Sequence, residues 1–222
     1  MLKPRKRLTR REIKEDPLVT QYVKYQKMLK TYSRHVNIGL IAIAAIVVIS
    51  VLVSRSKKNA EIHAEGDLVM AEQVYMSRDF ERAPAELKKV SDDYPGTEAA
   101  GRAVFFRANA LFHKGDFESA QIAFQEYVDD YGQIEMFLTS SLAGVAACEE
   151  TKENYADAAA LYHKAAKRNM DAFDAVYHLK SAARCYRMAD MKDKAKDLYE
   201  SILEKYPDSP VLNDVKFWMA TI

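Results

Sequence analysis

Glycine, proline and cysteine are all scarce in this sequence, which has seven glycines, six prolines and two cysteines among 222 residues. So few glycines and prolines argue against a collagen-like, low-complexity or loop-rich β architecture. Two cysteines cannot build the disulfide framework of a small secreted domain. Because 49% of the residues are hydrophobic, the chain nevertheless has enough apolar side chain for a substantial core.

A large net charge is also lacking, but the formal value of +1 conceals an uneven distribution. Residues 1–35 carry a net charge of +8, whereas residues 59–222 carry a net charge of −10. The larger part of the chain is therefore acidic, which disfavours nucleic acid as its partner.

Residues 36–54 form an uncharged run, VNIGLIAIAAIVVISVLVS. As a helix it would be roughly 28 Å long, close to the hydrocarbon thickness of a bilayer. It is therefore predicted to be a single transmembrane helix. A cleaved signal peptide is the alternative, but its charged leader would have to be 35 residues long, so an uncleaved anchor is preferred.

Cations predict the orientation of this helix, since 11 Lys and Arg residues precede it and only Arg55, Lys57 and Lys58 follow it closely. Positive charge is retained on the cytoplasmic side. We therefore expect a single-pass protein of the bacterial inner (plasma) membrane. Its N-terminus would be cytoplasmic and the bulk of the chain would be periplasmic or otherwise extracytoplasmic.

The cytoplasmic part is expected to be a basic tail over 1–16 and an amphipathic juxtamembrane helix over 17–35. Asp16 and Pro17 suit an N-cap and a first helical position. An apolar stripe with spacings of three and four runs from there into the membrane helix and consists of Leu18, Tyr22, Tyr25, Leu29, Tyr32 and Val36. Such a stripe favours contact with lipid headgroups, and a docking or dimerising helix is the alternative.

Within the apolar run, Gly39, Ala42 and Ala45 provide a small-residue edge along which another membrane helix could pack. The expected membrane and juxtamembrane contacts are Tyr22, Tyr25, Leu29, Tyr32, Gly39, Ala42 and Ala45. Residues 55–60 are expected to be a linker.

Four segments after the linker resemble one another, and their aligned alanines are 37 or 38 residues apart. A large apolar residue follows each of these alanines by four positions, and a small residue precedes each by 12. Small residues let two helices approach closely, and the large residue fills the space beside them. The aligned alanines are Ala83, Ala120, Ala158 and Ala195.

The ends of these segments carry turn and cap signals. Gly115 and Asp116 suit a tight turn between two helices. Tyr-Pro-Gly-Thr at 94–97 and Tyr-Pro-Asp-Ser at 206–209 would stop one helix at the proline and cap the next with Thr97 or Ser209.

This pattern resembles the tetratricopeptide repeat (TPR), in its variants with longer loops than the usual 34-residue unit. The resemblance implies an all-α fold: one transmembrane helix followed by a TPR-like α-solenoid of four helix pairs over 61–207 and a capping helix over 208–222. A solenoid needs such a cap to cover its last apolar face.

The resemblance also implies a concave groove lined by the first helix of each pair. Its second repeat would contribute Arg102, Phe105, Asn109 and Phe112, and its fourth Tyr177, Lys180, Arg184 and Arg187. Cationic and aromatic residues would suit an extended partner peptide with acidic and apolar groups. Alternatively, Phe105 and Phe112 simply pack against the neighbouring repeat.

No catalytic or cofactor motif accompanies the repeats. The five histidines and two cysteines lack metal-ligand spacing, and no phosphate-binding glycine loop occurs. Cys148 and Cys185 occupy the same position in consecutive repeats, about 10 Å apart by helix-packing distances, so buried free thiols are favoured over a bridge. We expect no enzyme, cofactor or metal.

In topology and repeat class the chain resembles YfgM-type ancillary subunits of the Sec translocon. The resemblance implies a membrane-anchored protein–protein interaction scaffold of the cell envelope. Its partners would be other proteins (envelope or membrane complex subunits, chaperones or clients) and the lipid bilayer, without nucleic acid. The alternative is an accessory structural subunit of one membrane complex, energy-transducing or for cell division, bound through the transmembrane and juxtamembrane helices. The oligomeric state is left open.

Overall fold

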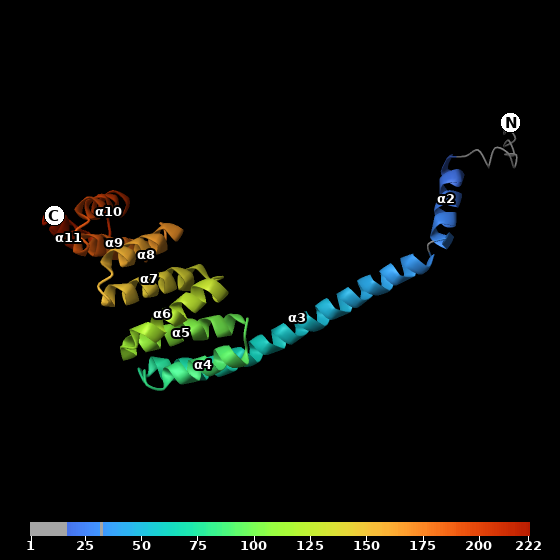
Figure 1. Cartoon of the computed structure of the whole chain (residues 1–222), viewed down its shortest axis with the longest axis horizontal. Helices are drawn as coiled ribbons and strands as arrows, with labels where there is room; N and C mark the ends of the chain where they lie inside the picture. Colours follow the sequence, from blue (N-terminus) through green and yellow to red (C-terminus); the bar gives the residue numbers. More distant parts are fainter. Residues whose placement is uncertain (1–16, 32) are drawn as a thin grey trace, which may run out of the picture. The chain divides into compact units, whose positions relative to one another are not determined.

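A computed structural model describes residues 17–31 and 33–222 of the chain, and within these residues the regular structure is helical with no strand. The chain divides into two compact units, Met1–Ser56 and Lys57–Ile222 (Figure 1). The expected all-α fold is therefore confirmed.

The first unit contains α2 (Pro17–Thr31) and the first part of α3 (Ser33–Met76). The whole apolar run at 36–54 is helical. The expected juxtamembrane helix at 17–35 falls on both helices, since α2 ends at Thr31 and α3 begins at Ser33. Asp16 and Tyr32 lie outside the described residues.

Helix α3 also continues through residues 55–60, which were expected to be a linker. This segment, RSKKNA, contains neither glycine nor proline, so nothing in it stops a helix. Polar composition alone was therefore a poor sign of a linker. The final part of α3, in the unit Lys57–Ile222, is the first helix of the repeat array.

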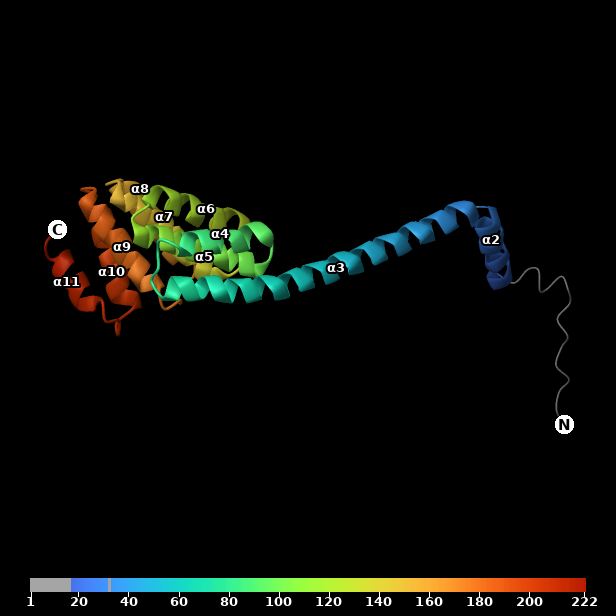
Figure 2. The same cartoon turned by 90° about the horizontal axis from the view of Figure 1, so that it is seen from below.

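Four antiparallel helix pairs and a final helix make up the second unit, as the repeat pattern predicts. They are the end of α3 with α4 (Ala83–Asp93), α5 (Glu98–Lys114) with α6 (Phe117–Glu126), α7 (Glu135–Thr151) with α8 (Tyr155–Arg168), α9 (Ala175–Met188) with α10 (Lys192–Lys205), and α11 (Leu212–Met219). A π-helical turn, η1 (Tyr127–Tyr131), follows α6. Figures 1 and 2 show these helices stacked in chain order, from α4 in green to α11 in red.

The aligned repeat positions form the core of this stack. The alanine of the second helix and the small residue of the first helix are buried in every pair, and so is the large residue that follows the alanine. These buried residues are Ala71, Ala83, Leu87, Ala108, Ala120, Phe124, Ala146, Ala158, Tyr162, Ala183, Ala195 and Tyr199. The sequence periodicity thus predicted the packing contacts correctly.

Caps at the helix ends agree with the sequence in two places. Gly115 adopts a left-handed conformation with φ of 88°, and the Asp116 side chain accepts a hydrogen bond from the Ser119 amide at 3.1 Å. The Thr97 hydroxyl accepts one from the Ala100 amide at 3.0 Å. Ser209, by contrast, is not the N-cap of the last helix: the chain makes a further turn, and Val211 occupies that position.

The start of α5 has a second cap that comes from the preceding repeat. The Glu61 carboxylate in α3 accepts hydrogen bonds from the amides of Glu98 and Ala99, both at 2.9 Å. A negative charge is favourable at this end of a helix. Glu61 therefore fixes the position of α5 on α3 within the repeat domain.

Candidate protein-binding surface

The eight residues predicted to line a groove lie on α5 and α9, the first helices of the second and fourth pairs. All eight are half-buried, so each has one side in contact with the protein. The structure groups four of them on α5 and four on α9, and α7 lies between these helices in the stack (Figure 1).

On α5, the cationic residue is held by carboxylates of the first repeat. The Arg102 guanidinium donates to Glu65 and to Glu72 on α3, with N–O distances of 2.8 Å to each. Burial works to lower the pKa of Arg102, but the carboxylates of Glu72 and Glu65 together raise it. Arg102 therefore ties two repeats together.

The cations on α9 are engaged in a similar way. Arg184 pairs with Glu150 at the end of α7, and the Lys180 ammonium lies 2.9 Å from the Asp214 carboxylate on α11. The Arg187 guanidinium lies 4.1 Å above the centre of the Trp218 ring, a cation–π geometry. An acidic ligand would therefore have to compete with contacts inside the protein.

The aromatic residues on α5 pack against the helices beside them. The centre of the Phe105 ring lies 4.8 Å from the centre of the Phe137 ring on α7. The backbone carbonyl of Phe105 accepts a hydrogen bond from the Asn109 side chain. Phe112 lies 5.1 Å from Phe117 on α6. Phe105 thus packs against the neighbouring repeat, as in the alternative interpretation, whereas the Phe112 ring contacts the second helix of its own pair.

A more accessible apolar surface lies at the starts of α7 and α9. The repeat alignment did not predict binding residues at most of these positions. The Phe173 side chain, in the connection between α8 and α9, is 85% exposed, and its ring lies 5.6 Å from that of Tyr177. Met136, at the start of α7, is 61% exposed. Met136, Phe173 and Tyr177 are called the Phe173 surface below.

Two hollows adjoin the Phe173 surface. One, of about 590 Å³, is bounded by Met136, Thr139 and Phe173. The other, of about 340 Å³, is bounded by Phe173, Tyr177 and Tyr206. The repeat consensus assigns groove positions only to helices, so it could not identify Phe173. The one sequence signal was an aromatic residue in a connection lengthened beyond the usual unit.

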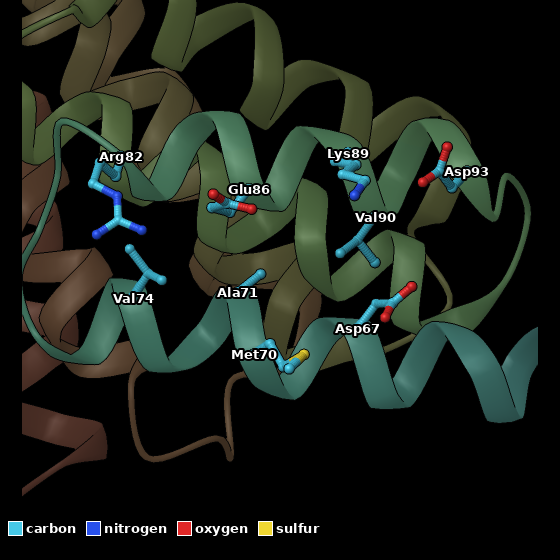
Figure 3. A pocket seen from close by; sticks show the side chains of 9 residues that line it. All are labelled: Asp67, Met70, Ala71, Val74, Arg82, Glu86, Lys89, Val90 and Asp93. Atoms are coloured by element: carbon cyan, nitrogen blue, oxygen red, sulfur yellow. The ribbon is translucent and has the colours of Figure 1, made fainter.

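A third hollow, of about 300 Å³, lies between α3 and α4 in the first pair (Figure 3). Because no helix pair precedes this one in the repeat array, one side of it remains uncovered. Figure 3 shows the apolar Met70 and Val74 on α3 facing charged residues on α4. Those charged residues are Arg82, which is the N-cap of α4, and Glu86, Lys89 and Asp93. The mixed charges make this hollow less suited to an apolar partner than the Phe173 surface.

The predicted membrane contacts lie in the other unit. Tyr22 and Tyr25 on α2 are exposed, and so are Gly39, Ala42 and Ala45 on α3. Tyr32 lies outside the described residues, as does the Leu29 side chain. One helix among the described residues is long and apolar enough to cross a membrane, judged by length and composition, and its apolar stretch is not buried in the protein.

The metal-ligating and thiol side chains of the described residues were the remaining candidates for a site. Within residues 17–31 and 33–222, no group of three His, Cys, Asp or Glu side chains is placed to hold a metal ion. Cys148 and Cys185 are free and buried, as the sequence predicted. Burial raises the pKa of Cys148 to about 11 and that of Cys185 to about 12, so both remain thiols at neutral pH.

Comparison with known protein families agrees with this geometry. Two family models, both described as tetratricopeptide repeat, match residues 71–133 and 151–216. The chain is a tetratricopeptide-repeat protein. A search of the curated proteins finds no match. Because TPR domains generally bind other proteins and lack catalysis, the chain is classed as a protein–protein interaction scaffold.

Proposed function

We propose that this TPR protein is a membrane-anchored interaction scaffold of the cell envelope, at a protein-export complex such as the Sec translocon or at an envelope-biogenesis complex. The repeats support a role in binding proteins. The long apolar stretch of α3, exposed rather than buried, supports an anchor over a core helix. The excess of cations before this stretch supports a cytoplasmic N-terminus and an extracytoplasmic repeat domain.

The observation that carries the binding role is the exposure of Phe173. Leaving a phenylalanine side chain exposed to water costs roughly 1.5–3 kcal/mol of free energy relative to burying it fully. Its contact with Tyr177 leaves most of the ring uncovered, and hollows adjoin it on two sides. Exposed aromatic residues beside pockets are typical anchors of protein interfaces. The partner would therefore insert apolar side chains here, beside the half-buried residues of α9.

The predicted groove residues have a supporting part in this proposal. Tyr177 belongs to the Phe173 surface, and Lys180, Arg184 and Arg187 extend it along α9. Their cationic groups would donate their remaining hydrogen bonds to partner carbonyls or carboxylates. Arg102, Phe105, Asn109 and Phe112 would form the edge of the same face on α5.

The test compares two Phe→Ser variants of the full-length chain. Phe173→Ser should abolish crosslinking to the main partner in membranes without changing the thermal unfolding of the repeat domain. Phe217→Ser is the matched control, since this ring on α11 is also exposed but lines neither of the two hollows beside Phe173. Equal crosslinking by both variants would remove the Phe173 surface from the proposal.

The alternative function is an accessory subunit of one membrane complex, bound through α2 and α3. It is favoured by the edge formed by Gly39, Ala42 and Ala45, where a Cβ atom added at Gly39 would meet nothing within 4 Å. Gly39→Leu separates the two functions. It should leave a partner of the repeat domain bound, but should release a partner that packs along the membrane helix.

The orientation has its own test. A reporter enzyme that is active only outside the cytoplasm should be active when it is fused to the C-terminus. A fusion active only inside the cytoplasm would contradict the proposed topology.

A further inference from the structure

Helix α2 has two chemically different faces. At about 100° per residue, Val19, Tyr22 and Val23 fall within an arc of roughly 100°, and all three are exposed. Lys24 lies well outside this arc, and Lys27 lies beyond its edge. The sequence of α2, PLVTQYVKYQKMLKT, contains no acidic residue. Gln26 also falls inside this arc, as does Lys30 near the end of the helix, so the apolar, tyrosine-bearing face is formed by the first two turns. Every charged residue of α2 is a lysine.

We propose that α2 lies in the plane of an anionic phospholipid surface, with Val19, Tyr22 and Val23 at the level of the acyl chains and the lysines at the headgroup phosphates. This inference rests on the proposed membrane anchor, because the apolar run begins only five residues after α2 ends.

Charge complementarity identifies the occupant of this face. The segment 1–35, to which α2 belongs, has a net charge of +8. Each Lys or Arg near an anionic membrane contributes about 1 kcal/mol of attraction. A nucleic acid would match the charge, but it would leave the valines and tyrosines in water. A lipid surface satisfies both faces at once, because tyrosine places its ring in the apolar layer and its hydroxyl among the headgroups.

The length of α2 also favours lipid over a second helix. The helix has 15 residues and ends at Thr31, so it includes little more than two heptads. Isolated helices of this length are marginal in water, and a coiled coil would need a longer stripe. An interfacial helix does not, because the membrane itself covers its apolar face.

The experiment places an environment-sensitive fluorophore on α2 in the full-length chain. The probe is attached to Val23→Cys on the apolar face or to Gln21→Cys, which lies about 160° away around the helix. The native Cys148 and Cys185 are buried, and labelling of the parent chain gives the background. Each labelled chain is incorporated into lipid nanodiscs of phosphatidylcholine alone or mixed with phosphatidylglycerol.

The Val23→Cys probe should shift to the blue and brighten several-fold in the anionic discs, whereas the Gln21→Cys probe should change little. Combining Lys24→Glu with Lys27→Glu should remove the response to anionic lipid. Lys57→Glu with Lys58→Glu changes the net charge equally and should preserve the response, because these lysines follow the apolar run.

A Val23→Cys probe that stays in water in every disc, or probes that respond equally at both positions, would overturn the interfacial placement. Co-elution of the chain with the discs separates this failure from that of the anchor. If the chain enters the discs but the probe stays in water, only the placement of α2 is wrong. If the chain elutes without lipid, the membrane anchor is wrong and the placement of α2 falls with it.

Discussion

The guanidinium of Arg184 on α9 and the carboxylate of Glu150 on α7 form a two-pronged ion pair between the third and fourth repeats. Arg184 donates from Nη1 to Oε1 and from Nη2 to Oε2, the latter at 2.8 Å. The hydroxyl of Tyr162 lies 3.4 Å from the same carboxylate. Arg184 was predicted to bind a partner, but its guanidinium already links two repeats.

Replacing Arg184 with Met should destabilise the C-terminal repeats. The Glu150 side chain is 22% exposed and would lose its cation. Hydrogen bonds to charged groups contribute about 1.5–3 kcal/mol, and the 40% exposure of Arg184 reduces this to about 1 kcal/mol because solvent screens the pair. Urea unfolding followed by Trp218 fluorescence measures the loss, since Trp218 lies against the last repeat. The double variant with Glu150→Gln should lose less unfolding free energy than the sum of the losses in the two single variants.

Acid should weaken the same joint. The hydrogen bonds from Arg184 hold the pKa of Glu150 below its ordinary value, outweighing the opposing effect of burial. A carboxyl group with a lowered folded pKa adds stability above its unfolded pKa of about 4.3, and that stability is lost as the pH falls through the folded value. Between neutral pH and pH values below 4.3, the parent chain should therefore lose more unfolding free energy than Glu150→Gln does. Parallel pH curves for the two chains would contradict this account.

Two glycines in helices should respond to alanine in opposite directions. A Cβ atom at Gly144 on α7 would lie 2.6 Å from the Phe124 ring, whereas one at Gly66 on α3 would meet nothing within 4 Å. Gly144→Ala should cost about 1–3 kcal/mol by overpacking, and Gly66→Ala should add up to about 1 kcal/mol through helix propensity. Thermal unfolding of both variants provides the measurement, and each glycine is the control for the other.

The two thiols should be inert in the folded chain. Cys148 and Cys185 are fully buried, and burial raises the pKa of both. Since the thiolate is the reactive form, a maleimide reagent should modify neither cysteine at neutral pH but both in urea. Rapid modification of the native chain would show that the repeat stack opens around these residues.

The repeat core could be predicted from the sequence because it depends on local spacing. Ala120 and Phe124 must be four residues apart to pack two helices, and that requirement recurs in each pair. The use of the groove positions could not be predicted in the same way. Whether Arg102 is available to a partner depends on how one repeat is rotated against the next. In this structure the rotation brings Glu65 and Glu72 within reach of Arg102. The spacing of residues along one helix does not determine that rotation.

Connections were predicted less well than helices, for a related reason. Phe173 has no position in a helical repeat consensus, so its exposure became visible only in the structure. Ser209 follows a helix-ending proline just as Thr97 does, but only Thr97 caps the next helix, because an extra turn precedes α11. Such differences depend on the length of each connection and on what it packs against.

The most direct test of the scaffold function introduces a photoreactive phenylalanine analogue into the full-length chain in its native membrane. The analogue replaces Phe173 on the proposed binding surface, Ile41 on the apolar stretch of α3 or Lys196 on the exposed face of α10. The account predicts a specific crosslinked protein from position 173 and none from position 196. A crosslinked partner obtained only from position 41 would contradict it, because the apolar stretch of α3 rather than the repeat domain would then be the binding element.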